Sequence, residues 1–201
     1  MNALPPPAPW QDQLRRRLAG DFVVDPWGLD PEVHDTAVRL GRLRWNVDVE
    51  GAVHVPDEGP ALLLIQRHLG LSDVAVVATG VRLTTPRRVR TVGVPGVRWF
   101  EATMRRSGAA MAHPEEIGGL LRDGHVVGLG LRATPFSRRP GGVDPELVIP
   151  ALAGDVPILP VATYGNELGR NWTVQIGAPI TLSHDGGRLA AVEHLEQARD
   201  L

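Results

Sequence analysis

The fold is decided by the stretch Ala61-Leu-Leu-Leu-Ile-Gln-Arg-His68-Leu-Gly-Leu-Ser-Asp73-Val-Ala-Val-Val77. Its first five residues are all apolar, and this length and composition predict a buried strand. The second apolar run follows Ser72, a candidate N-cap, and predicts a helix. Ligands of open α/β sheets bind at the carboxyl ends of strands, so the turn between the two runs is a candidate site.

The candidate catalytic residues in this turn are His68 and Asp73. A turn between the strand and the helix brings the carboxylate back toward the imidazole. A carboxylate beside a histidine fixes its tautomer and raises its basicity, which suits a general base and its orienting acid. The same spacing also fits a surface histidine near a helix that Asp73 caps.

Composition places limits on the class of protein. The chain has 201 residues, of which 43% are hydrophobic, so one large domain, alone or with an appendage, can bury a sizeable core. The chain has no cysteine, which excludes disulfides, thiolate metal ligands and a cysteine nucleophile. Its net charge of -2 argues against a strong general attraction to nucleic acid.

Outward from the opening stretch, apolar runs typical of strands alternate with helical patterns. This alternation predicts the α/β class, with a mostly parallel mixed sheet flanked by helices. One predicted strand, Val156–Val161, contains prolines that favour an edge position or a bulge. The segment Glu146–Leu152 is ambiguous, because Pro150 argues against a long helix. A helix over Glu32–Leu43 places Val33, Ala37 and Leu40 on one face.

We divide the chain into residues 1–24, a Pro-rich N-terminus with a short amphipathic helix, and residues 25–201, a single domain. Trp10, Leu14 and Leu18 follow one another at i, i+4 and i+8, beside three arginines. Such a helix either lies on a membrane surface or docks on the domain. An apolar run of about 18 residues is missing, so we expect no spanning helix.

All 21 basic residues are arginine, and seven of them lie between Val74 and Pro114. This basic lobe is open to two interpretations. It is either a surface that meets phosphate groups or anionic lipid, or an ordinary solvated face.

Several other sites are not expected. The histidines do not cluster at metal-ligand spacing, so we expect no metal. Gly128-Leu-Gly-Leu-Arg-Ala133 has the outline of a dinucleotide fingerprint, but the Pro-rich segment that follows cannot open a helix. A Gly-x-Ser-x-Gly elbow is also missing, which argues against a hydrolase-type serine nucleophile.

The order of motifs carries a family resemblance. His68 and Asp73 form a His-x4-Asp pair, Gly108-Ala-Ala-Met follows, and Val156-Pro-Ile-Leu-Pro-Val and Val174-Gln-Ile-Gly-Ala-Pro-Ile come later. This order resembles the glycerolipid acyltransferase superfamily, in particular its lysophosphatidic-acid (1-acylglycerol-3-phosphate) acyltransferase branch. The resemblance extends from about Asp25 to Ile180.

The resemblance implies an α/β acyltransferase of phospholipid synthesis at a membrane surface. An acyl group would move from an acyl-CoA or acyl-carrier-protein thioester to a hydroxyl acceptor such as a lysophospholipid. His68 would be the general base and Asp73 its orienting acid, with no cofactor beyond the thioester co-substrate. The implied location is the cytoplasm, with peripheral contact to the inner face of the membrane as an option.

The chain departs from the family where the acceptor binds. The family has Asn before the histidine, where this chain has Arg67. Its Phe-Pro-Glu-Gly-Thr block is replaced by a stretch ending in Arg132, Ala133 and Thr134, and His113 stands near an expected arginine. We therefore take as candidate substrate-binding residues Arg67, Arg132, Ala133, Thr134 and His113, with Arg138 or Arg139 as further anion contacts.

Three functional hypotheses remain. The first is an acyltransferase with a changed acceptor, which we favour because the His–Asp pair is retained. The second is a catalytically inactive relative that binds acyl chains or lipid, or that scaffolds a partner. The third is a binding module with no lipid role, against which the stripe of Trp10, Leu14 and Leu18 argues.

Overall fold

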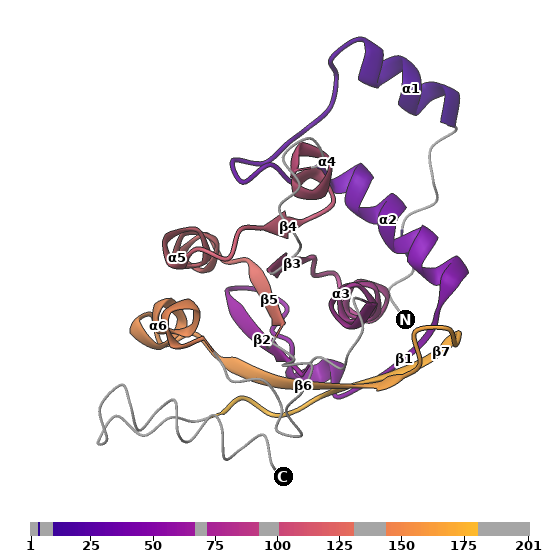
Figure 1. Cartoon of the computed structure of the whole chain (residues 1–201). Coiled ribbons are helices and arrows are strands. Elements are labelled where there is room, and N and C mark those ends of the chain that lie inside the picture. Colours follow the sequence, from indigo (N-terminus) through magenta and orange to yellow (C-terminus); the bar gives the residue numbers. More distant parts are fainter. Residues whose placement is uncertain (1–3, 5–9, 67–71, 93–100, 131–143, 181–201) are drawn as a thin grey trace.

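A computed structural model describes residue 4 and residues 10–66, 72–92, 101–130 and 144–180. These residues form a seven-stranded sheet with helices on both faces (Figure 1). The strands are β1 (Asn46–Glu50), β2 (Ala61–Ile65), β3 (Val89–Val92), β4 (Ala109–Ala110), β5 (Val126–Gly130), β6 (Ile158–Gly165) and β7 (Asn171–Ile176). The helices are α1 (Trp10–Leu18), α2 (Pro31–Arg44), the short 3₁₀ helix η1 (Ala52–His54), α3 (Ser72–Thr84), α4 (Glu101–Arg106), α5 (Pro114–Arg122) and α6 (Pro145–Ala153).

Strand β2 lies in the middle of the sheet, whose order is β1-β7-β6-β2-β5-β3-β4. Strands β2 to β6 are parallel to one another, whereas β7 is antiparallel to β6 and pairs in parallel with β1. The predicted α/β class with a mostly parallel mixed sheet is therefore confirmed. All five residues of β2 are buried, as its uninterrupted apolar sequence predicts.

Alternate side chains of β2 enter two apolar cores, one on each face of the sheet. Leu63 and Ile65 pack into the core that α3 covers. Leu62 and Leu64 pack into the core that α5 and α6 cover. Figure 1 shows α3 on one side of the sheet with α2 beyond it, and α5 and α6 on the other side. The strand that precedes the candidate site is thus held from both faces.

The proline-containing strand β6 is internal, so of its two predicted alternatives, an edge position or a bulge, the edge position is wrong. It pairs with β2 on one side and with β7 on the other. The carbonyl of Pro160 accepts a hydrogen bond from Gly177 N at 2.8 Å, and the ladder with β7 begins at Val161. Beyond the proline, pairing resumes at an isolated bridge between Ile158 and Ile180, so the internal strand accommodates the proline at an interruption of the ladder.

Helix α6 resolves the ambiguous segment Glu146–Leu152. The helix begins at Pro145, which suits a first helical position, and the Asp144 carboxylate accepts from Glu146 N at 3.2 Å. Pro150 lies within the helix, which has nine residues. The proline therefore permits a short helix here, in agreement with the argument against a long one.

Helix α2 buries a different face from the predicted apolar one. Leu40 of the predicted face is 61% exposed. The buried residues are His34, Asp35, Val38 and Gly41. A Cβ at Gly41 would lie 2.7 Å from Thr79 Oγ1, so glycine permits the close approach of α2 to α3. Packing between the helices thus overrides the apolar periodicity, and it buries a carboxylate that needs charged partners.

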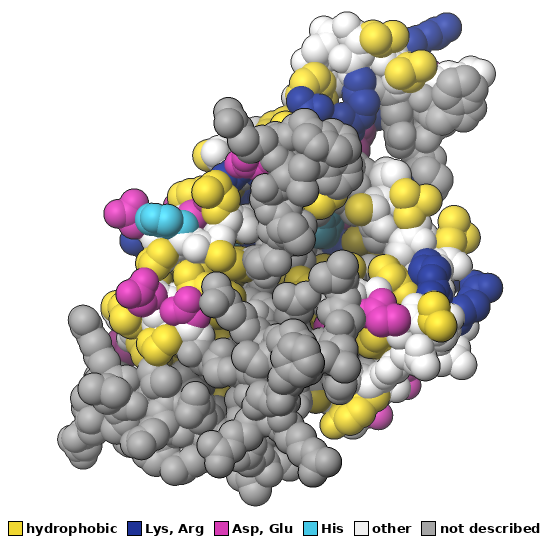
Figure 2. Space-filling view, viewed as in Figure 1, with side chains coloured by type: hydrophobic (Ala, Val, Ile, Leu, Met, Phe, Trp, Pro, Cys, Tyr) yellow, Lys and Arg dark blue, Asp and Glu magenta, His cyan; other side chains and the backbone are white. Residues whose placement is uncertain are grey.

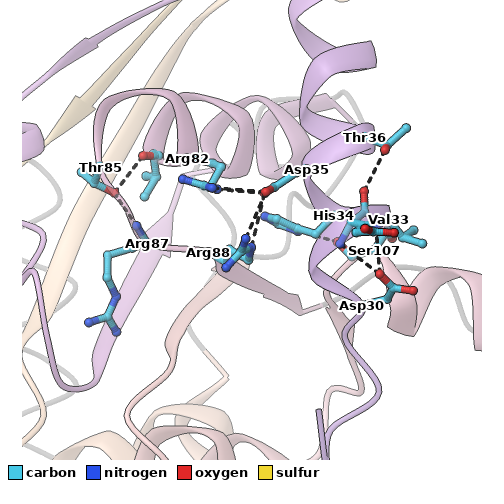
Figure 3. A network of polar contacts seen from close by, with 12 residues as sticks. Asp30, Val33, His34, Asp35, Thr36, Arg82, Thr85, Arg87, Arg88 and Ser107 are labelled. Carbon is cyan, nitrogen blue, oxygen red and sulfur yellow. Dashed lines mark hydrogen bonds and ion pairs between the residues drawn. The ribbon is translucent and has the colours of Figure 1, made fainter. Parts of the chain in front are cut away.

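Asp35 joins three parts of the fold through two arginines (Figure 3). Arg82 Nε of α3 donates to Asp35 Oδ1 at 2.9 Å, and Arg88, just before β3, donates to Asp35 Oδ2 at 3.0 Å. Burial of the carboxyl group raises its pKa, but the two guanidinium groups outweigh this effect and leave the pKa below its ordinary value. The carboxylate is therefore charged and fully engaged at neutral pH.

Other arginines of the predicted basic lobe also make internal contacts. Arg90 is almost completely buried and pairs with Asp25. Arg105 pairs with Glu116 at 2.9 Å, and Arg87 donates to three backbone carbonyl oxygens. These described arginines bind the fold together, so the interpretation of the lobe as a phosphate- or lipid-binding surface is not supported for them.

His34 is a second buried polar residue of α2. Its Nδ1 lies 2.8 Å from the carbonyl oxygen of Ser107, which can only accept, so Nδ1 carries the proton. Its Nε2 is buried with no hydrogen-bond partner among the described residues. Burial lowers the pKa of His34, and the hydrogen bond to Ser107 only partly opposes this effect. The imidazole is thus neutral in the folded protein.

We expect Asp35→Asn to lower the free energy of unfolding by about 3–5 kcal/mol, because it leaves two guanidinium groups without their carboxylate in a buried setting. Urea unfolding followed by circular dichroism measures the loss. The matched control is Asp48→Asn on β1, where an exposed carboxylate should change stability by less than about 0.5 kcal/mol. Equal losses in the two variants would contradict the assigned role of Asp35.

We expect the free energy of unfolding to fall as the pH drops below about 6.5, because the unfolded chain then protonates His34 while the folded chain resists protonation. Above that pH the residue is neutral in both states and contributes no dependence. His34→Asn retains a donor for the Ser107 carbonyl and removes the titration. Urea unfolding between pH 5 and pH 8 should show a shallower fall for the variant, and an unchanged slope would refute the assignment.

Candidate active site

The carboxyl ends of β2, β3 and β5 lie at one edge of the sheet, because these strands are parallel. The segments that follow them, residues 67–71, 93–100 and 131–143, lie outside the described residues. Arg67 and His68 belong to the first of these segments. Arg132, Ala133, Thr134, Arg138 and Arg139 belong to the third. The predicted roles of these residues therefore stay predictions.

Asp73 is described, and it lies in the first turn of α3 with no exposed surface. Its Oδ1 accepts a hydrogen bond from Thr163 Oγ1 of β6 at 2.6 Å. This distance is typical of a hydroxyl that donates to an ionised carboxylate. The positive end of the α3 dipole also favours a negative charge in this turn. The site thus contains a buried carboxylate whose orientation is set by another strand.

Strand β6 also contacts Gln66, the residue that precedes the 67–71 segment. The last described residue before the segment is Gln66, whose N–H donates to the carbonyl oxygen of Val161 at 2.8 Å. The first described residues after it are Ser72 and Asp73, the latter bonded to Thr163. Both flanks of the segment that carries His68 are therefore anchored on one strand, two residues apart.

The turn between β6 and β7 anchors the start of α3. Ser72 donates twice to Glu167, from its N–H to Oε1 at 3.0 Å and from its Oγ to Oε2 at 2.5 Å. Ser72 is the first residue of α3, whereas the sequence predicts it as the N-cap. A carboxylate from a distant turn satisfies this helix end, because the chain brings Glu167 within reach only after folding.

His113, the remaining substrate-binding candidate, is described and exposed. It follows β4 and occupies the N-cap position of α5, and its side chain makes no capping hydrogen bond. Helix α5 covers the sheet face opposite to α3, and β5 and β3 separate β4 from β2. The structure therefore places His113 and Asp73 on opposite faces of the sheet, and the substrate contact of His113 stays a prediction.

A surface hollow of about 490 Å³ lies at the opposite edge, where β3 and β5 begin. Its lining includes Arg87, Arg88, Arg90 and His125. Two of these arginines are paired with Asp35 and Asp25, and the third donates to backbone carbonyls. The arginines of this hollow thus stabilise the fold through internal contacts. The hollow lies at the other edge of the sheet from Asp73 and the carboxyl ends of the strands.

Thr163 and Glu167 were not identified from the sequence. Both lie at least 90 residues from the residues that they contact in α3. A faint signal for Thr163 exists, because its spacing of two from the apolar Val161 places it on the same, buried face of a strand. Glu167 lies in a polar turn, where no local pattern indicates a distant helix end.

Comparisons with known proteins support the fold and leave the activity open. No model of a known protein family matches the chain. Uncharacterized proteins of Mycobacterium tuberculosis and Mycobacterium bovis are 28% identical to it over 77% of its length. The chain spans about half the length of these curated relatives, because the match covers 48% of each.

A solved structure shares the fold. The crystal structure of the 1-acyl-sn-glycerophosphate (LPA) acyltransferase PlsC from Thermotoga maritima matches 85% of this chain and 78% of its own, with a TM-score of 0.54. Sequence identity is 16%. The predicted resemblance to glycerolipid acyltransferases is thus confirmed at the level of the fold.

Proposed function

We propose that this protein is an acyltransferase that moves an acyl group from an acyl-CoA or acyl-carrier-protein thioester to a hydroxyl acceptor. The observation that carries the proposal is the buried Asp73 carboxylate at the carboxyl edge of the sheet. Burying a carboxylate is unfavourable unless it is hydrogen-bonded, so its retention beside the histidine-bearing segment favours a chemical role. The shared fold with PlsC is consistent with this role.

In the proposed reaction, His68 removes the proton from the acceptor hydroxyl as its oxygen attacks the thioester carbonyl carbon. The carbon–sulfur bond then breaks, and the proton passes from the imidazole to the leaving thiolate. Asp73 holds the imidazole in the tautomer that can accept the proton. The thioester is already activated, so the scheme needs no covalent intermediate on the protein.

The acceptor contacts are proposed on chemical grounds. Arg67 and Arg132 would meet an anionic group of the acceptor or of the thioester carrier, because guanidinium binds phosphate and carboxylate oxygens in pairs. Ala133, Thr134 and His113 would complete the contact. A lysophospholipid-like hydroxyl compound is the acceptor class that we propose.

We expect His68→Ala to lower acyl transfer by about 10²–10⁴-fold, the usual contribution of a positioned general base. Asp73→Asn should lower the rate less, because the amide still accepts from Thr163 but no longer supports an imidazolium. Release of free CoA from an acyl-CoA, measured with lysophosphatidic acid and a panel of other hydroxyl acceptors, gives the rates.

The matched control is His125→Gln, which changes a histidine at the amino end of β5, far along the strand from the site. It should retain wild-type turnover. If wild-type protein transfers no acyl group from either carrier to any acceptor of the panel, the enzymatic proposal is wrong. An inactive relative that binds acyl chains or lipid would then be the better interpretation.

Peripheral membrane contact is a second part of the proposal, and it rests on α1. Arg16 and Arg17 of α1 pair with Glu32 and Asp30 at the start of α2, at 2.7 and 2.9 Å. The helix is therefore docked on the domain through its charged side, and its apolar residue Leu18 remains 80% exposed. The docking alternative therefore holds for the arginines, and the exposed Leu14 and Leu18 support the proposed membrane contact.

Exposed leucines occur on α2 as well, at Leu40 and Leu43. Figure 2 shows hydrophobic and arginine side chains interspersed over α1 and over the neighbouring surface of α2. Leucine beside arginine suits the boundary of a bilayer with anionic headgroups. Among the described residues, no helix has the length and apolarity to cross a bilayer.

We expect Leu14→Gln/Leu18→Gln to lower binding to vesicles containing anionic phospholipid by at least about tenfold, because each leucine contributes roughly 1.5–3 kcal/mol when fully buried in lipid. Sedimentation of the full chain with sucrose-loaded vesicles measures the partition. Val53→Gln/Leu168→Gln, which changes two exposed apolar residues elsewhere, is the control and should sediment as wild type. Equal binding of all three proteins would remove the membrane role of α1.

A further inference from the structure

Strand β6 continues beyond the end of β2. Their parallel register ends at the pair Ile65 and Val161, whereas β6 runs on to Gly165. Thr163 therefore lies two residues beyond the last position of β6 that is paired with β2, within reach of Gln66 and Asp73. It is fully buried and lies opposite Val174 of β7.

The hydroxyl of Thr163 has one proton, and two acceptors of the described part of the chain lie within its reach. Oδ1 of Asp73 lies 2.6 Å from Oγ1, and the carbonyl oxygen of Gln66 lies 3.5 Å away. The shorter and charged acceptor receives the proton, since charge-assisted hydrogen bonds of this length are about twice as strong as neutral ones. The hydroxyl group thus lies between both flanks of the 67–71 segment and bonds to the carboxylate.

Packing alone does not require a hydroxyl at this position. Valine has nearly the shape of threonine and costs less free energy to bury, and the surrounding core of this face consists of apolar side chains, most of them valines. The side-chain χ2 angle of an aspartate is soft, so a donor on Oδ1 is needed to fix the plane of the carboxylate. A fixed plane directs the Oδ2 lone pairs in one direction.

We propose that Thr163 is a positioning residue: through its hydrogen bond it orients Asp73, and Asp73 in turn sets the tautomer and direction of the His68 imidazole. This proposal rests on the proposed function, because it assigns Thr163 to the same catalytic unit. The chain therefore uses a triad of imidazole, carboxylate and hydroxyl in which the hydroxyl contacts the carboxylate and takes no part in the proton transfer.

The test compares Thr163→Val, which removes the hydroxyl and keeps the shape, with Thr163→Ser, which keeps the hydroxyl. We expect Thr163→Val to lower kcat for acyl transfer about tenfold with KM within about twofold of wild type, and Thr163→Ser to restore kcat to within about threefold. Thr79→Val, which changes another buried threonine of the fold, is the matched control and should retain wild-type kcat. Thermal unfolding of each variant confirms that it is folded.

A spectroscopic readout makes the test independent of turnover. The ring ¹⁵N shifts of His68 in histidine-labelled protein at pH 9, assigned with His68→Ala, report the tautomer. We expect one tautomer in wild type and in Thr163→Ser, and a mixture in Thr163→Val. If Thr163→Val matches Thr163→Ser in both kcat and tautomer while remaining folded, the proposal is overturned.

The two proposals fail in different ways. Equal or absent acyl transfer by wild type and His68→Ala refutes the proposed function, and the ¹⁵N pattern then decides the role of Thr163 alone. A change of tautomer in Thr163→Val supports the positioning role, and an unchanged pattern rejects it. Turnover that depends on His68 but not on Thr163 rejects the positioning role and leaves the proposed function in place.

Discussion

The parallel pairing of β2 with β6 is the constraint on which the candidate site depends. Because both strands run in the same direction, the longer β6 extends past the end of β2 and reaches the chain that follows it. Val161 accepts from Gln66, and Thr163 donates to Asp73.

Ion pairs of buried and half-buried side chains link several elements of the fold. Asp35 connects α2 to α3 and to the start of β3, and Asp25 connects the turn before α2 to Arg90 of β3. Each pair links elements that are distant in the sequence, and removal of one partner would leave the other charge unpaired. The arginine content of a lysine-free chain thus serves the interior of the molecule as well as its surface.

The same use of charge explains the exposed apolar surface of the N-terminal helices. Since α1 is docked by ion pairs of Arg16 and Arg17, its leucines are not needed for packing. Since α2 packs through His34 and Asp35, Leu40 is displaced to the outside. Together these contacts leave leucines exposed on both helices, and these leucines are the physical basis of the proposed lipid contact.

The sequence by itself determined the class of fold, because an uninterrupted apolar run such as Ala61–Ile65 is stable only between two covered faces, and strand and helix periods alternate along the chain. It also predicts Asp73 as the partner of the candidate base His68, because the two residues are five positions apart in the segment that follows this strand. Only the tertiary structure decided that Val156–Val161 belongs to an internal strand of the sheet and that α2 buries a carboxylate. It also decided that Thr163 and Glu167 form hydrogen bonds with the first turn of α3. The internal position depends on pairing with both β2 and β7. The other two features depend on contacts between residues at least 40 positions apart, for which short-range periodicity carries no signal.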